Sequence, residues 1–82
     1  MIYIELKTLV FKKQLEWGRS ITLTEIADAT GISRMTLHRM VKNNTYNAST
    51  EHLDKICHYL DCPLTDLVRW EPNTPEAKIN VA

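Results

Sequence analysis

The sequence has little of what marks several classes of protein. Among its 82 residues are only two cysteines and two glycines, and no apolar run approaches the roughly 20 residues that span a membrane. Ten Lys and Arg residues balance ten Asp and Glu residues, which argues against a histone-like protein that binds nucleic acid through bulk charge. There is no glycine-rich loop that would bind phosphate, and no Ser or Cys nucleophile motif with a general base to activate it. We therefore expect a cytoplasmic protein that is not an enzyme, with no catalytic residues and no membrane segment.

The two cysteines, Cys57 and Cys62, have histidines close by in the sequence. Their Cys-x4-Cys spacing does not match the tight pairs of structural zinc sites. Cys57 lies on an apolar stripe between Leu53 and Leu60, which favours a thiol packed in the core. We therefore predict no metal site and no cofactor, no disulfide in a reducing compartment, and no small-molecule ligand.

The apolar residues, 44% of the chain, are enough for one small core. Their spacing predicts an all-α domain over residues 1–72, with five helices that begin near Leu6, Thr22, Ser33, Ser49 or Thr50, and Leu64. The alternation in residues 2–4 also permits a short strand, which would pair with residues 68–71 as a two-stranded ribbon. Residues 73–82 are polar and interrupted by proline, so we expect a flexible tail there.

Residues 22–42, TLTEIADATGISRMTLHRMVK, have the pattern of two short helices joined by a tight turn. Thr22 and Glu25 are spaced as a capping box, in which each side chain accepts a hydrogen bond from the other residue's backbone N–H. Gly31 supplies the positive φ that ends the first helix. Ser33 is placed to cap the second helix.

The second helix of this pair has one apolar face and one cationic face. Its inward residues have the i, i+3, i+4 spacing of a buried stripe: Leu37, Met40 and Val41. Opposite them lie Met35, His38, Arg39 and Lys42, with Arg34 beside them in the first turn. Because no Asp or Glu occurs between Asp28 and Glu51, like charges repel along this face, and a bound polyanion would relieve the repulsion.

The pattern resembles the lambda-repressor-like helix-turn-helix family, which includes Cro, the phage repressors and the Xre-type regulators. The small, turn and inward apolar positions that carry the resemblance are Ala27, Gly31, Ile32, Leu37 and Met40. The segment LDCPLTDLV, residues 60–68, is similar to the end of small single-domain members. The resemblance implies a small DNA-binding transcriptional regulator of phage, prophage or bacterial type. Since no effector domain is evident, we expect a repressor that occupies an operator and blocks polymerase.

The resemblance also implies that helix 33–43 enters the major groove of double-stranded DNA with its first turns nearest the bases. The expected base-contacting residues are Arg34, Met35, His38 and Arg39, with the arginines reading guanine. The expected phosphate-contacting residues are Thr22, Ser33, Thr36, Lys42, Asn43, Asn44 and Thr45. Leu23 stands where family members often have Gln, so no phosphate contact is carried over to that position.

A homodimer is expected on a pseudo-palindromic operator, with the two recognition helices about 34 Å apart. The apolar candidates for the dimer contact, which we expect to be exposed, are Ile2, Tyr3, Ile4, Val68 and Trp70. The alternative is a protein-interaction module, such as an antitoxin or antirepressor-like partner, that uses the same helices on protein. A single exposed Arg is usually solvated surface, but the motif and the absence of nearby acids favour DNA.

Overall fold

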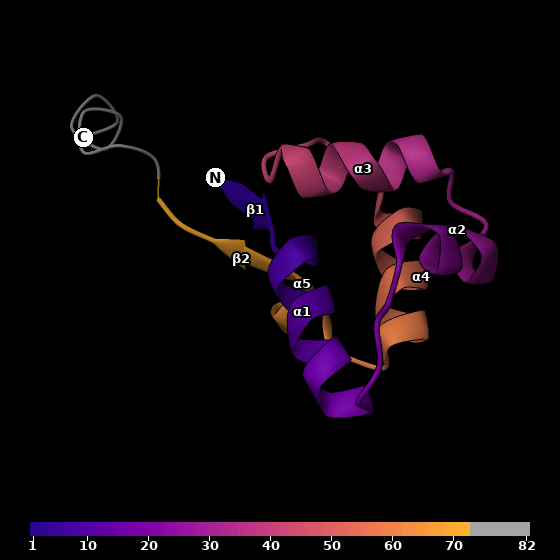
Figure 1. Cartoon of the computed structure of the whole chain (residues 1–82). Coiled ribbons are helices and arrows are strands. Elements are labelled where there is room, and N and C mark those ends of the chain that lie inside the picture. Colours follow the sequence, from indigo (N-terminus) through magenta and orange to yellow (C-terminus); the bar gives the residue numbers. More distant parts are fainter. Residues whose placement is uncertain (73–82) are drawn as a thin grey trace, which may run out of the picture.

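The computed structural model of the chain describes residues 1–72 (Figure 1). In chain order these residues form β1 (Ile2–Ile4), α1 (Leu6–Trp17), α2 (Leu23–Thr30), α3 (Arg34–Lys42), α4 (Thr50–Leu60), α5 (Leu64–Leu67) and β2 (Val68–Trp70). The predicted five-helix domain and its terminal ribbon are thus confirmed. The flexible tail predicted for residues 73–82 lies outside the described residues.

One core holds the five helices together, and each helix contributes to it. Its fully buried side chains are Leu6 of α1, Ile26 of α2, Leu37 and Met40 of α3, Ile56 and Leu60 of α4, and Leu67 of α5. Burying a side chain of this size stabilises the fold by about 1.5–3 kcal/mol. None of these helices is long enough to be stable alone in water, so this shared core is what fixes their arrangement.

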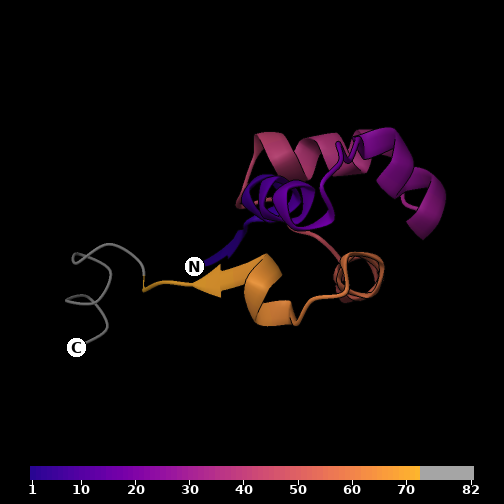
Figure 2. The same ribbon diagram turned by 60° about the horizontal axis from the view of Figure 1, so that its bottom comes forward.

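The two strands pair in antiparallel register, with Ile2 opposite Trp70 and Ile4 opposite Val68. In both ribbon views this pair lies to one side of the helices (Figures 1 and 2). The Ile4 N–H donates to the Asn44 carbonyl, 2.6 Å away, which ties the ribbon to the loop after α3. Of the five apolar residues predicted to be exposed here, Ile2 and Trp70 are exposed and Tyr3 and Val68 are half-buried. The prediction is wrong for Ile4, which is only 4% exposed because it packs against the core.

The ends of the motif helices follow the local sequence. The Thr22 hydroxyl accepts from the Glu25 N–H at 3.1 Å, and Gly31 ends α2 with φ of 76°. The other half of the predicted capping box is wrong, because the Glu25 carboxylate accepts hydrogen bonds from Arg19 and Tyr59 instead. A paired, charge-assisted bond to guanidinium is stronger than one to a backbone N–H.

Candidate nucleic-acid interface

The turn between α2 and α3 is held by a buried threonine. The Thr30 hydroxyl donates to the Ile26 carbonyl at 2.6 Å and accepts from the Ile32 N–H at 3.2 Å. Ser33 then begins α3, since its hydroxyl accepts from the Thr36 N–H at 3.1 Å. Because these hydroxyl and backbone groups all have hydrogen-bond partners within the turn, the network fixes α3 relative to α2.

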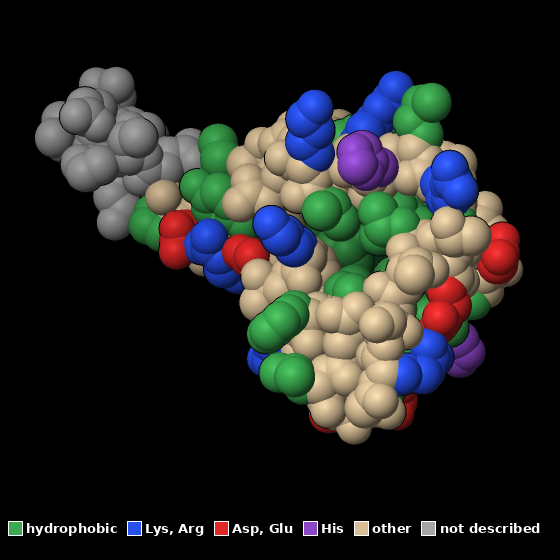
Figure 3. Space-filling view, in the orientation of Figure 1, with side chains coloured by type: hydrophobic (Ala, Val, Ile, Leu, Met, Phe, Trp, Pro, Cys, Tyr) green, Lys and Arg blue, Asp and Glu red, His purple; other side chains and the backbone are tan. Residues whose placement is uncertain are grey.

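The outward face of α3 gathers the side chains that the sequence proposes for base contact. Leu37 and Met40 are fully buried, so the opposite side of the helix faces outward. All four base-contact candidates are exposed: Arg34, Met35, His38 and Arg39. Together with Lys42, Leu23 and Thr24 they line one shallow hollow. Figure 3 shows cationic and histidine side chains along the surface over α3.

The cations of this face have no carboxylate partners in the part of the chain that is described. Each salt bridge within residues 1–72 involves some other Lys or Arg. Arg34 does donate a hydrogen bond to the Thr24 hydroxyl at 3.3 Å, which places its guanidinium beside the first turn of α2. An exposed neutral bond of this kind contributes little, so the guanidinium can exchange it for a base or a phosphate.

The candidate phosphate-contacting residues fall into three exposed or half-buried groups. Thr22 lies at the N-terminus of α2, where backbone N–H groups favour an anion. Ser33 and Thr36 lie at the N-terminus of α3, and their hydroxyls bond each other at 2.8 Å. The third group is Lys42 at the end of α3 with the loop residues Asn43, Asn44 and Thr45. The Asn43 side-chain oxygen accepts from the Thr45 N–H at 3.2 Å and from its hydroxyl at 2.8 Å, which shapes this loop.

A cluster behind α2 supports the interface, and sequence reasoning missed it. The Arg19 guanidinium makes two bonds of 2.8 Å to the Glu25 carboxylate and lies 5.3 Å from the ring centroid of Trp17. The Tyr59 hydroxyl, from α4, donates to the same carboxylate. The cluster thereby joins the loop before α2, the first turn of α2 and α4. No spacing in the sequence pairs Glu25 with a tyrosine that lies 34 residues away.

This cluster makes the stability of the fold depend on pH. Hydrogen bonds from Arg19, and then from Tyr59, lower the pKa of Glu25 from 4.5 to about 2. Because the folded pKa lies below the unfolded one, the stabilisation is complete above pH 4.5 and is lost as pH falls towards 2. We expect the melting temperature, followed by circular dichroism, to fall less steeply over this range in Glu25→Gln than in wild type. If the melting temperatures of the two proteins fall equally with pH, protonation of this cluster is not coupled to folding.

The thiols lie away from this interface, at the end of α4. Cys57 and Cys62 are free and half-buried, and both pack against the core. Burial is the main reason that the pKa of each thiol is raised, to about 11 for Cys62. Residues 1–72 contain no cluster of three His, Cys, Asp or Glu side chains that would suit a metal ion. No helix in the same range is long and apolar enough to cross a membrane.

A helix pair with a tight turn, a shared core and a cationic outer face defines a helix-turn-helix DNA-binding domain. A family model described as a Cro/C1-type HTH DNA-binding domain matches residues 18–73, which include α2, α3, α4, α5 and β2. The chain therefore belongs to the Cro/C1-type helix-turn-helix family, and the resemblance to lambda-repressor-like proteins is confirmed. It is a DNA-binding transcriptional regulator. The comparison with curated proteins gives no match.

Proposed function

We propose that the protein is a sequence-specific repressor, of phage, prophage or bacterial type, that inserts α3 into the major groove of an operator. The observation that carries this proposal is the exposed outer face of α3, where Arg34, Met35, His38 and Arg39 share one hollow. A major groove about 12 Å wide admits an α-helix and presents guanine acceptors to arginine. Because an operator-bound protein blocks polymerase sterically, repression needs no catalytic group. The proposed location is the cytoplasm, where bacterial DNA lies.

Phosphate contacts are proposed on both sides of the inserted helix. Thr22, Ser33 and Thr36 flank its N-terminal side, while Lys42 and loop residues 43–45 flank its C-terminal end. Contacts to two stretches of the DNA backbone would fix the depth and direction of α3 in the major groove. They would not discriminate between base sequences.

The expected salt dependence tests this arrangement. Lys42 is the one cation among the proposed phosphate contacts, so a dimer should neutralise about two phosphates. The logarithm of the binding constant should then fall with the logarithm of salt concentration with a slope near −2. The measurement is fluorescence anisotropy on a duplex selected from a random DNA pool, repeated at several salt concentrations. A slope near zero, or a pool that yields no preferred sequence, would instead favour the protein-interaction module as the function of these helices.

A homodimer through the terminal ribbon is also proposed. Ile2 and Trp70 lie opposite each other in the register and are 60% and 68% exposed. The ribbon is bonded to the loop that follows α3, so a ribbon contact would couple the second subunit to the end of the recognition helix. A self-complementary apolar contact of this kind has two-fold symmetry, as a pseudo-palindromic operator requires.

The double variant Ile2→Ser/Trp70→Ser should therefore shift the protein from dimer to monomer in analytical ultracentrifugation. It should also lose affinity for a two-half-site duplex more than for a single half-site, because only the former benefits from the second subunit. The matched control is Leu64→Ser, which also removes an exposed apolar side chain but lies on α5. A variant that remains as dimeric as wild type would place the dimer contact elsewhere.

A further inference from the structure

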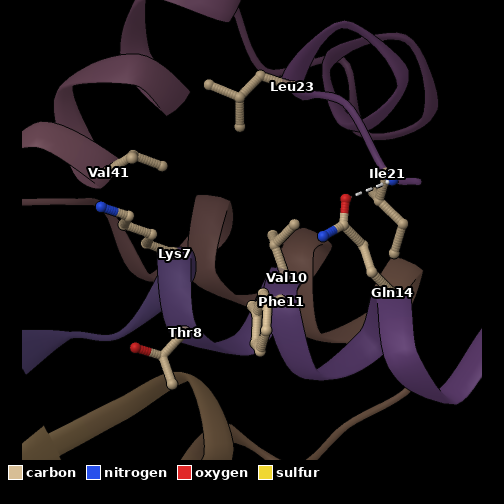
Figure 4. A pocket seen from close by; sticks show the side chains of 8 residues that line it. All are labelled: Lys7, Thr8, Val10, Phe11, Gln14, Ile21, Leu23 and Val41. Carbon is tan, nitrogen blue, oxygen red and sulfur yellow. Dashed lines mark hydrogen bonds between the residues drawn. The ribbon is translucent and has the colours of Figure 1, made fainter.

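An apolar groove lies beside α1, next to the proposed DNA-contacting surface. Its volume is about 620 Å³. Figure 4 shows Val10 and Phe11 of α1 on one side and Leu23 and Val41, from α2 and α3, on the other. The groove thus lies between one helix and the facing ends of two others.

The apolar surface continues from the groove onto the outer side of α1. Phe11 and Leu15 are four residues apart, so they lie one above the other on the helix. They are 60% and 71% exposed, although residues of this type are usually buried. An apolar groove that continues into two such side chains is typical of a surface that binds another protein.

The flanks of this apolar pair are cationic. At about 100° per residue, Lys7 and Lys12 fall on opposite sides of the stripe formed by Phe11 and Leu15. Both lysines are exposed, and neither makes a salt bridge within residues 1–72. The carboxylate on this helix, Glu16, already pairs with Lys13 at 3.4 Å. The surface therefore has an apolar centre between two positive charges.

We propose that this surface docks an acidic amphipathic helix of a partner protein. An apolar stripe at i, i+3, i+4 and i+7 would fill the groove and cover Phe11 and Leu15. Carboxylates beside that stripe would meet Lys7 and Lys12. A second copy of this chain fits less well, because two such faces would bring lysines against lysines.

The docked helix would lie beside the DNA-contacting surface, since Leu23 lines both the groove and the hollow over α3. A partner bound there is positioned to affect operator binding. The docking proposal itself does not depend on the proposed repressor function.

The test uses the full chain and two labelled helical peptides with leucines at i, i+3, i+4 and i+7. One peptide carries glutamates at its flanking positions, and the other carries lysines there. By fluorescence anisotropy, the acidic peptide should bind saturably and the basic one much more weakly. Phe11→Ser should weaken the acidic complex by roughly tenfold or more, because an interface anchor is lost. Lys12→Glu should weaken the preference for the acidic peptide, and Lys7→Glu/Lys12→Glu should reverse it.

Three controls separate this surface from the others. The double variant Arg39→Ala/Lys42→Ala should bind the acidic peptide as wild type does, as should Trp70→Ser. Loss of binding in the arginine-lysine variant alone would mean that the peptide occupies the DNA-contacting face and would overturn the proposal. Equal binding of the two peptides would also overturn the proposal. So would a wild-type protein that is dimeric and becomes monomeric in Leu15→Ser, because a second copy would then occupy this surface. Phe11→Ser should retain wild-type affinity for the selected duplex, so failure here is distinguishable from failure of the repressor proposal.

Discussion

Replacement of Arg39 by alanine is expected to weaken binding to the selected duplex by about 5- to 150-fold for each half-site that the protein contacts. This range corresponds to the 1–3 kcal/mol by which a bidentate arginine-guanine contact discriminates against other bases. Arg39 is exposed on the outer face of α3 and makes no salt bridge within residues 1–72. Folding should therefore be unaffected. The measurement is the dissociation constant at fixed salt, with the melting temperature as a check on folding.

The matched control for charge is Lys55→Ala on α4. It removes one cation and leaves the α3 face intact, because Lys55 pairs with Glu51 at 3.0 Å. Arg39→Ala should also relax the preference for guanine at one position of each half-site, whereas Lys42→Ala should weaken all sequences about equally. If Lys55→Ala and Arg39→Ala reduce affinity equally, the loss of affinity reflects the total charge of the protein. The prediction that Arg39 reads a base would then be wrong.

Leu37→Ala, on the opposite side of the same helix, should destabilise the fold by about 2–5 kcal/mol. The side chain is fully buried in the core that all five helices share. Small domains have about 5–15 kcal/mol of stability in total, so this single change removes much of it. Urea unfolding followed by circular dichroism measures the loss.

Met35→Ala is the matched control for stability, since Met35 is 64% exposed two residues away. It should change the free energy of unfolding by no more than about 0.5 kcal/mol while lowering operator affinity through a lost contact with a thymine methyl group. Similar unfolding free energies for the two variants would show that α3 is not oriented with Leu37 inward, and the assignment of its outer face would fail with it.

Much of the architecture could be predicted because the signals are local. The i, i+3, i+4 spacing placed Leu37 and Met40 in the core, and both are fully buried. Gly31 was expected at positive φ, and it ends α2 there. The alternation of residues 2–4 was enough to propose the ribbon, since strand residues alternate between two faces.

The features that escaped prediction depend on contacts between distant parts of the chain. Glu25 matches a capping box locally, but Arg19 and Tyr59 provide stronger partners once α4 packs beside α2. Ile4 was expected to be exposed with its neighbours, yet the ribbon's bond to Asn44 brings it to the core. The groove beside α1 has side chains from α1, α2, α3 and the loop between α1 and α2, so no single helical period reveals it.

Methylation protection on the selected duplex tests most directly whether the outer face of α3 reads the major groove. Dimethyl sulfate attacks guanine N7, which lies in the major groove, and adenine N3, which lies in the minor groove. We predict that the bound protein shields guanine N7 atoms in each half-site, and that Arg39→Ala restores methylation at one guanine of each half-site. Protection confined to adenine N3, or protection of guanines that is the same in wild type and Arg39→Ala at saturation, would contradict the account.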